Sequence, residues 1–448
     1  MSTATIILAA GKGTRMNSEL AKVLHPLAGV PILHHAMRAA ETLSPTRQIV
    51  VTGHQAEAVA SAARDFDADV KTALQTEQLG TGHAVKQAIP ALDGFEGKVI
   101  ILYGDTPFVS EATLKQLEQA ASDITVLGFE AEDPARYGRL IMDGDSLRRI
   151  VEWKDASPAE RSINLCNSGV MAMDANLLRT LIEEVKNDNA AGEYYLTDLP
   201  GLARAQGHSV GVVTCPEAET LGIDTLANLA RAEGIWQNLR REELLADGVM
   251  MQAPDSVHLA FDTVIGRGAQ IEPYVVFAQG VTIETGAQIR AFSHLEGAHV
   301  ARGAIVGPYA RLRPGAELSE NTRVGNFVEM KNTVLAEGSK VNHLSYIGDA
   351  HVGPRTNIGA GTITCNYDGV SKHKTEIGSD AFIGSNTMLV APVSVGSGAM
   401  TASGSVVTSD VEADAMATAR APQVDKPGAA RKLMDMLRAR KTRRERTN

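Results

Sequence analysis

A glycine-rich, basic segment near the N-terminus carries residues that could bind phosphate. The segment Leu8-Ala9-Ala10-Gly11-Lys12-Gly13-Thr14-Arg15-Met16 follows an apolar, β-branched run at residues 3–8. Glycines two positions apart allow a sharp turn that brings backbone N–H groups close to a ligand, and Lys12 and Arg15 add positive charge. The spacing matches neither GxGxxG nor GxxxxGK[ST], so the dinucleotide and P-loop templates are excluded. The segment favours an anion such as a nucleotide, with an ordinary turn at a strand end as the open alternative.

Two further positions could do chemistry. Asp105 follows the apolar run 99–102, which would place its carboxylate at the carboxyl edge of a parallel sheet, where it suits Mg²⁺. It could instead cap the next helix. His343 stands in the segment Asn342-His343-Leu344-Ser345-Tyr346. Its imidazole titrates near neutrality and could accept a proton, although a single histidine is more often structural.

The elements that must position the first group predict an α/β domain. Residues 1–225 alternate strand-like and helix-like segments, which is typical of a doubly wound, Rossmann-like sheet with right-handed crossovers. We expect strands at 3–8, 48–51, 98–102, 124–129, 139–142 and 210–213. We expect helices between them, for example at 32–40, 111–120 and 175–185. Residues 226–247 have apolar positions at helical spacing and no glycine-rich turn, which predicts a linker helix.

The second half of the chain is a hexapeptide repeat. Apolar residues recur every six positions from residue 265, with one-residue slips, for some 140 residues: Ile265, Ile271, Phe277, Ile283, Ile289 and Leu295, then Val300, Val306, Leu312, Leu318, Val324 and Met330, and onward to Val407. This period predicts a left-handed parallel β-helix over residues 248–425, with three units per triangular coil. The polar stretch 366–374 breaks the period and should loop out, and such loops commonly carry function.

Composition limits the class of protein. The chain has 448 residues, of which 44% are hydrophobic, and no stretch approaches the roughly 18 apolar residues of a membrane span. No signal peptide is recognised, so a cytoplasmic location is expected. Three scattered cysteines fit neither a disulfide framework nor a zinc cluster.

Charge is distributed unevenly. Nine Lys/Arg and two Asp/Glu give residues 426–448 a net charge of +7. Since the whole chain has a net charge of −10, the remaining residues carry a net charge of −17. An acidic body argues against nucleic acid as the main ligand, and the basic tail is expected to be disordered. The flat faces of a regular solenoid favour self-association as a symmetric ring.

Several motifs resemble one enzyme family. The first segment above, Ala21-Lys22-Val23-Leu24, residues 75–84 (QTEQLGTGHA) and Tyr103-Gly104-Asp105 resemble the sugar-nucleotide pyrophosphorylases. With the second half included, residues 1 to about 423 resemble the bacterial bifunctional N-acetylglucosamine-1-phosphate uridylyltransferases and glucosamine-1-phosphate acetyltransferases. The resemblance implies synthesis of UDP-N-acetylglucosamine for peptidoglycan and lipopolysaccharide, by a cytoplasmic homotrimer associating through the β-helix.

For the first domain, the resemblance implies attack of N-acetylglucosamine-1-phosphate on the α-phosphate of UTP, assisted by Mg²⁺. Arg15 and Lys22 would be catalytic, and Asp105 and Asp224 would hold the metal. The nucleotide would contact Leu8, Ala9, Ala10, Gly11, Gly13, Lys22, Gln75, Gly80, Thr81, Tyr103, Gly104 and Asp105. The sugar phosphate would contact Gly138, Glu152, Asn167, Tyr195 and Thr197. One departure concerns the second metal ligand, because the family usually has Asn where this chain has Asp224 in Gly222-Ile223-Asp224. Mg²⁺ binding should survive, with the effect on turnover left open.

For the second domain, the resemblance implies acetyl transfer from acetyl-CoA to glucosamine-1-phosphate with His343 as general base. The sugar phosphate would contact Arg313, Lys331, Tyr346, Asn357 and Lys372. Acetyl-CoA would contact Ala360, Asn366, Tyr367, Ser385, Ser403 and Arg420, where Ser403 replaces a frequent alanine of the family.

Two alternatives are weighed against this interpretation. A pyrophosphorylase with a regulatory β-helix would explain the first-domain motifs but not His343, Tyr346 and Asn366-Tyr367 together. A non-enzymatic subunit should have lost the basic residues of the glycine-rich segment or Asp105, and all of them are present.

Overall fold

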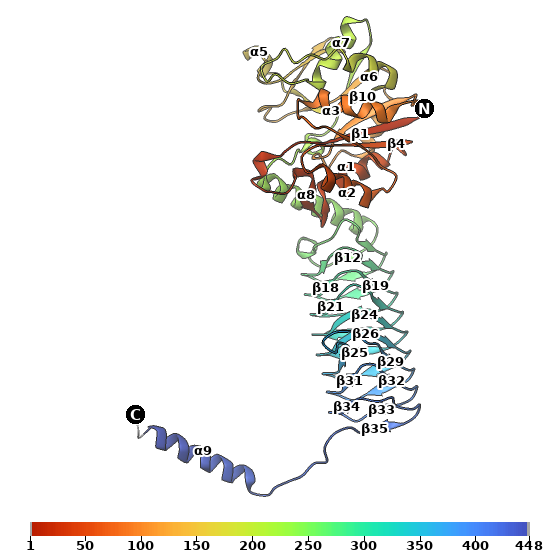
Figure 1. Cartoon of the computed structure of the whole chain (residues 1–448), viewed down its shortest axis with the longest axis vertical. Coiled ribbons are helices and arrows are strands. Elements are labelled where there is room, and N and C mark those ends of the chain that lie inside the picture. The colour runs from red at the N-terminus through yellow and green to blue at the C-terminus, as the bar shows by residue number, and fades with distance from the viewer. Residues whose placement is uncertain (1, 446–448) are drawn as a thin grey trace. The chain divides into compact units, whose positions relative to one another are not determined.

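The computed structural model describes residues 2–445 and divides into two compact units (Figure 1). Unit 1 runs up to Glu243 and also includes Leu259–Phe261. Unit 2 comprises Leu244–His258 and the residues from Asp262 onward. No described helix has both the length and the apolar character that a bilayer crossing requires.

Unit 1 is built on a mixed, mainly parallel sheet. Its strand order is β11 (Val210–Thr214), β7 (Ile124–Glu130), β10 (Leu165–Asp174), β6 (Lys98–Tyr103), β1 (Thr3–Ala9), β4 (Arg47–Thr52) and β5 (Lys71–Leu74). All neighbours in this order are parallel except β10, which is antiparallel to both β6 and β7. A hairpin of β8 (Arg139–Asp143) and β9 (Ser146–Val151) extends from β10, and β2 (Pro26–Leu27) pairs with β3 (Val30–Pro31).

Helices cover both faces of this sheet because the side chains of β1 alternate between two apolar cores. Ile6 packs in a core with α3 (Thr81–Ala88), α6 (Ala175–Ile182) and α7 (Leu199–Ala205). Ile7 packs in the other core with α1 (Ile32–Glu41), α2 (Ala56–Phe66) and α4 (Glu111–Gln119). The remaining helix of this region is the single turn α5 (Pro158–Arg161). The expected doubly wound arrangement is therefore confirmed.

All six strands expected in this unit form, but the sequence interpretation missed the short pair β2 and β3 and also β5, β9 and β10. The omission of β10 has a clear cause, because Asn167, Ser168 and Gly169 interrupt its apolar pattern with residues typical of turns. The pairing of β10 with β7 shifts register between Asn167 and Met171, so the polar residues form an irregularity inside a long central strand.

Most of helix α8 (Leu226–Ala246) belongs to unit 1, where side-chain hydrogen bonds hold it. Glu233 Oε2 accepts a hydrogen bond from the amide of Ala28 at 2.8 Å. The side chain of Gln237 donates to the carbonyl of Leu259 at 2.7 Å and accepts from its amide at 3.0 Å. The two units therefore divide near the C-terminal end of α8.

Unit 2 is a parallel β-helix, the left-handed hexapeptide fold that was expected. One face consists of β12 (Met250–Met251), β14 (Gln270–Ile271), β17 (Gln288–Ile289), β20 (Ile305–Val306), β23 (Arg323–Asn326), β25 (Lys340–His343), β27 (Asn357–Ile358), β30 (Phe382–Ile383), β33 (Met400–Thr401) and β35 (Met416–Ala417). The next face contains β13 (Val264–Ile265), β16 (Thr282–Ile283), β19 (Ala298–Val300), β22 (Ala316–Leu318), β24 (Glu329–Leu335), β26 (Tyr346–Val352), β29 (Thr375–Ile377) and β32 (Val393–Val395). The remaining strands are β15 (Val276–Phe277), β18 (His294–Leu295), β21 (Arg311–Leu312), β28 (Ile363–Cys365), β31 (Met388–Val390) and β34 (Val406–Val407). Among these short strands, β21 pairs with the long strand β24 and β28 pairs with the long strand β26.

The coils stack in the register that the hexapeptide period predicts. Ile265 pairs with Ile283, eighteen positions on, whereas Ile283 pairs with Val300 after seventeen, which absorbs the first slip. The periodic aliphatic residues are buried along the interior. Asn357 pairs with Phe382 after twenty-five positions, because the polar stretch 366–374 loops out as expected.

The C-terminal tail differs from the expected disordered segment. Residues 429–445 form helix α9 (Ala429–Glu445), in which every residue is exposed. Several basic residues and few helix breakers follow Gly428, so a helix is locally compatible with this sequence. The rest of the predicted tail, residues 446–448, lies outside the described residues.

The interior aliphatic column should dominate the stability of the β-helix. Leu312 is fully buried between coils. We expect Leu312→Ala to destabilise unit 2 by about 2–5 kcal/mol, because it removes buried methyl groups and leaves a cavity. The neighbouring exposed Arg311→Ala should change stability by less than about 0.5 kcal/mol. Urea denaturation followed by circular dichroism checks this, and equal effects of the two substitutions would contradict the burial argument.

Candidate active sites

A pocket of about 320 Å³ lies at the carboxyl edge of β1 and β6 in unit 1. All of the predicted nucleotide-binding residues line it except Gly13 and Gly104. Val23, Gln78 and Ala84 also line it and were not predicted. Gln78 was within reach of the sequence interpretation, since it stands inside the motif at 75–84 that carries Gln75, Gly80 and Thr81.

The two predicted glycines outside the lining hold the pocket walls together. Gly13 has φ +60°, and a Cβ there would lie 2.5 Å from the Cβ of Lys22. The amide of Gly104 donates to the carbonyl of Leu8 at 2.9 Å, which joins the end of β6 to the end of β1. Gly13 is therefore required for the close approach of the glycine-rich segment to Lys22.

The wall around Gln75 is fixed by short contacts. The buried side chain of Gln75 donates from Nε2 to the carbonyl of Gly80 at 3.1 Å. Gly80 has φ +112°, and a Cβ there would lie 2.6 Å from the carbonyl oxygen of Tyr194. Thr81 Oγ1 accepts from the amide of Leu196 at 3.1 Å. These contacts order the segment 75–81 against residues 194–196.

Two cations and two carboxylates meet at the floor of the site. Lys22 Nζ bridges Asp105 Oδ2 and, at 3.0 Å, Asp224 Oδ1. Arg15 reaches the same Asp224 oxygen at 2.8 Å. Burial alone would lower the pKa of Lys22, but the two carboxylates outweigh burial and raise it.

Backbone contacts set the positions of both carboxylates. The amide of Ile223 donates to the carbonyl of Asp105 at 3.0 Å, which places Asp224 beside Asp105. The N-cap of the next helix, α4, is Ser110, whose hydroxyl accepts from the amide of Thr113. Asp105 therefore does not cap that helix, and the alternative structural interpretation is excluded.

The predicted sugar-contacting residues form a second cluster in unit 1. The hydroxyl of Thr197 donates to Glu152 Oε1 at 3.1 Å, and the amide of Asn167 donates to the carbonyl of Gly138 at 2.9 Å. A Cβ on Gly138 would lie 3.4 Å from Glu152 Oε1, so the two pairs are adjacent. Burial raises the pKa of Glu152. Burial, with nearby acidic residues that include Glu152, raises the pKa of Tyr195 to about 12.

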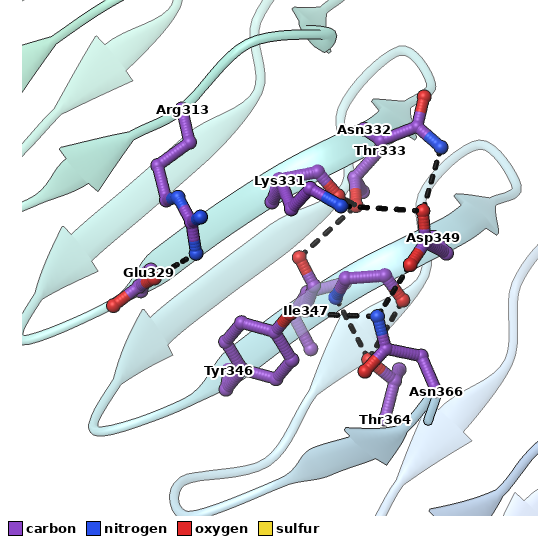
Figure 2. Close-up of polar contacts among 11 residues, drawn as sticks. Arg313, Glu329, Lys331, Asn332, Thr333, Tyr346, Ile347, Asp349, Thr364 and Asn366 are labelled. Carbon is purple, nitrogen blue, oxygen red and sulfur yellow. Dashed lines mark hydrogen bonds and ion pairs between the residues drawn. The ribbon is translucent and has the colours of Figure 1, made fainter. Parts of the chain in front are cut away.

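In unit 2, a network of polar side chains surrounds Asp349 (Figure 2). Asn332 Nδ2 donates to Asp349 Oδ1 at 2.7 Å, Asn366 Nδ2 donates to Oδ2, and Lys331 Nζ lies 3.9 Å from Oδ1. Burial would raise the pKa of Asp349, but the two amide donors and the charges of Lys331 and Lys372 outweigh burial and lower it. Asp349 therefore organises this cluster, although the sequence interpretation missed it.

Three of the predicted phosphate contacts are cationic. Arg313 pairs with Glu329 at 2.8 Å, one coil away from Lys331 (Figure 2). Lys372 lies beside Lys331, whose ammonium lowers the pKa of Lys372. Two adjacent ammonium groups repel each other unless an anion joins them, so their placement favours a phosphate.

The loop at 366–374 is held in a defined shape. The amide of His373 donates to the carbonyl of Asn366 at 2.9 Å, which closes the loop at its base. Asp368 accepts from the amides of Val370 and Ser371, and it pairs with His373 at 2.7 Å. Because the loop is closed at its base, Lys372 lies next to Lys331 where the chain rejoins the β-helix. Tyr367 is exposed, and its hydroxyl donates to the carbonyl of Gly369 within the loop.

His343 lies at the end of β25 with its ring exposed and oriented by one contact. Its Nδ1 lies 2.8 Å from Oδ1 of Asn326, the residue paired with it in the preceding coil. Since an amide oxygen accepts, Nδ1 donates, and Nε2 is left with a lone pair. Asn326 was missed, but the coil period could have found it, because it precedes His343 by seventeen positions.

Four of the predicted acetyl-CoA residues form a column that continues from His343, namely Ala360, Ser385, Ser403 and Arg420, whereas Asn366 contacts Asp349 and Tyr367 lies in the loop. The amide of Gly361, next to Ala360, donates to the carbonyl of His343 at 3.3 Å, and the amide of Asn386 donates to the carbonyl of Ala360 at 2.7 Å. Ser385 accepts from Gly404, and Arg420 Nη1 donates to the carbonyl of Ser403 at 2.8 Å. Asn357 lies one coil from His343 on the same face, where it pairs in register with Lys340.

Comparisons with known proteins agree with both units. Residues 5–168 match the model of the MobA-like NTP transferase domain, and residues 262–297 match that of the bacterial transferase hexapeptide (six repeats). The chain is 64% identical over 443 residues to the Bifunctional protein GlmU of Ruegeria sp. (strain TM1040), covering 98% of this chain and 99% of the relative. It is 63% identical over 448 residues to the Bifunctional protein GlmU of Roseobacter denitrificans, covering 100% of both. The relative of the same description from Paracoccus denitrificans is 62% identical over 438 residues, 98% of each chain.

Full-length identity at this level confirms the resemblance seen in the motifs, and both family models fall where the two predicted domains lie. The chain therefore belongs to the GlmU family of bifunctional enzymes, with the uridylyltransferase and acetyltransferase activities that make UDP-N-acetylglucosamine.

Proposed function

We propose that each unit houses one of the two reactions, with UTP and N-acetylglucosamine-1-phosphate in unit 1 and acetyl-CoA and glucosamine-1-phosphate in unit 2. The observation that carries this proposal is the separation of two chemically different sites. A carboxylate–cation cluster lies in one unit, and the other unit holds an oriented imidazole and, separately, a pair of neighbouring ammonium groups. Acetyl transfer comes first, and its product is the acceptor of the uridylyl group.

The donor set in unit 1 fits Mg²⁺. Two carboxylate oxygens, from Asp105 and Asp224, converge on a single ammonium, so they lie close enough to share one cation. Among the described residues no group of three or more His, Cys, Asp or Glu side chains is arranged to hold a metal, so phosphate oxygens and water would complete the shell. When bound, Mg²⁺ would neutralise charge developing on the phosphates.

The chain's own residues position the uridylyl transfer. Arg15 and Lys22 would bind the triphosphate and stabilise the charge that increases as pyrophosphate leaves. The segment from Gln75 to Thr81 would contact the uracil, because its side chain and backbone polar groups line the pocket. The cluster of Glu152, Asn167 and Thr197 would hold the sugar so that its phosphate oxygen faces the α-phosphate.

In unit 2, His343 would act as general base. Its Nε2 would take a proton from the amine of glucosamine-1-phosphate as the nitrogen attacks the thioester carbonyl. The C–S bond then breaks and CoA leaves as a thiol after protonation. Arg313, Lys331 and Lys372 would hold the sugar phosphate, and the amide of Ala360 would donate to the oxyanion.

Self-association as a homotrimer is also part of the proposal, and its support is an exposed aromatic ladder. Tyr274, Phe292, Tyr309 and Phe327 stack along one corner with ring centroids 4.9–5.3 Å apart, and the exposed Leu344 follows beside His343. Because the exposed aromatic residues follow the spacing of the coils, each can pack against the equivalent residue of another copy. We further propose a cytoplasmic location, consistent with three free cysteines, and small molecules rather than nucleic acid or membrane as partners.

The two activities should separate by mutation. Asp105→Ala should reduce UDP-sugar formation by about 100-fold or more while acetylation continues, because only unit 1 loses a carboxylate. His343→Ala should reduce CoA release by about 10²- to 10⁴-fold and spare uridylylation. Coupled assays for pyrophosphate and free thiol measure both rates. Equal loss of both activities in a folded single mutant would contradict separate sites.

The two reactions together should make UDP-N-acetylglucosamine from glucosamine-1-phosphate, acetyl-CoA, UTP and Mg²⁺. Product should form only when all four are present.

Asn326 should act as a positioning residue for His343. Asn326→Ala should lower kcat for acetyl transfer by about 10- to 100-fold, with little change in KM for the sugar phosphate, because the ring loses its orientation while the residues proposed to bind the phosphate stay in place. Gln270→Ala, on the same face but remote from His343, is the control. A change confined to KM would refute this role.

The ladder should control assembly. Replacing Tyr309 and Phe327 together by Ser should weaken oligomers and reduce acetyl transfer, while uridylyl transfer continues, because apolar area is lost from the proposed contact. Val264→Ser, exposed but outside the ladder, is the control. Analytical ultracentrifugation at micromolar concentration measures the outcome, and unchanged sedimentation of the double variant would reject the ladder as the contact.

A further inference from the structure

Four charged side chains that meet beside the unit 1 pocket balance one another within the chain itself. Lys22 and Arg15 carry two positive charges, and Asp105 and Asp224 carry two negative charges. With a neutral Asn in place of Asp224, the same four residues would carry a net charge of +1. Asp224 therefore cancels the surplus positive charge of this four-residue cluster.

The pairing also occupies the groups that would receive the phosphates. Lys22 bridges both carboxylates, and its side chain is only 15% exposed, so this pairing is little screened by solvent. Arg15 is 70% exposed, so its pair with Asp224 is the weaker of the two. The Lys22 ammonium stands between the oxygens that a divalent cation would use, and one position cannot hold both.

Lys22 can vacate this position without leaving the pocket. Its Cβ is fixed by the close approach of Gly13, whereas the rest of the side chain is a flexible four-carbon stem that lines the pocket. Moving the ammonium away from Asp105 and Asp224 therefore leaves it facing the space where the triphosphate would lie.

We propose that Asp224 makes nucleotide binding conditional on a divalent cation, because Asp105 and Asp224 hold Lys22 and Arg15 until the cation takes the carboxylates. This inference rests on the proposed uridylyltransferase site and concerns the order in which that site fills. Displacement of Lys22 opposes cation binding in the absence of nucleotide. When a nucleotide is present, its phosphates bind the released ammonium of Lys22, and this favours cation binding. The cation and the nucleotide therefore bind cooperatively.

The first test measures UTP binding to the full-length protein by isothermal titration calorimetry, in EDTA and in Mg²⁺. In EDTA, Asp224→Asn should bind UTP about three- to tenfold more tightly than wild type, because Lys22 and Arg15 are less occupied. The factor by which Mg²⁺ strengthens UTP binding should therefore be smaller for Asp224→Asn than for wild type. Asp123→Asn removes one negative charge from the far end of the sheet and should change neither value. Unchanged UTP affinity of Asp224→Asn in EDTA would overturn the proposal.

The second test measures Mn²⁺ binding alone by electron paramagnetic resonance, without nucleotide. Lys22→Met keeps the length of the side chain and removes its charge, so it should bind Mn²⁺ about tenfold more tightly than wild type. Equal or weaker Mn²⁺ binding by Lys22→Met would show that the ammonium does not compete with the cation. Failure of the proposed function gives a different result, in which folded wild-type protein binds neither Mn²⁺ nor UTP under any of these conditions.

Discussion

The register of parallel strands determines which side chains meet in both units. In unit 1, the pairing of β1 with β6 sets the glycine-rich segment after β1 beside the turn that carries Asp105. In unit 2, each coil is hydrogen-bonded to the next at equivalent positions, so Asn326, His343 and Gly361 follow one another along the solenoid. A shift of one residue in the strand pairing of either unit would turn the side chains to the opposite face, and the site residues would no longer meet.

The two sites prepare for anionic substrates in opposite ways. In unit 1, positive and negative side chains neutralise one another beside a pocket. In unit 2, Lys331 and Lys372 stand next to each other with a single buried carboxylate, Asp349, behind them. The first arrangement suits a substrate that brings a metal with it, and the second suits a simple phosphate monoester.

Much of this architecture follows from local patterns in the sequence. The aliphatic residues from Ile265 to Val407 are buried because a period of six specifies one inward residue per short strand. The glycine-rich segment and Asp105 stand out because glycines and charges follow apolar runs, whereas Gln75, Gly80 and Thr81 were predicted only through the family resemblance. Strand β10 was missed because Asn167 to Gly169 resemble a turn, and tertiary pairing outweighs that local preference.

Asn326 and Asp349 were missed for a different reason. Neither belongs to the buried period, and their importance comes from partners one coil away in space, at His343 and Asn366. Helix α9 was missed because charge was given more weight than the local compatibility of this sequence with a helix.

The enlarged coil has a consequence for how such enzymes can change. Asn357 still pairs with Phe382 across the twenty-five-residue interval, and the coils before and after it keep their usual pairing. The pitch of the β-helix therefore does not depend on this loop, and its length and its sequence beyond Asn366 can vary while the scaffold stays intact. Substrate preference of the acetyltransferase could therefore be redesigned by exchanging this one hairpin-like insert, provided that a basic residue returns to the place of Lys372.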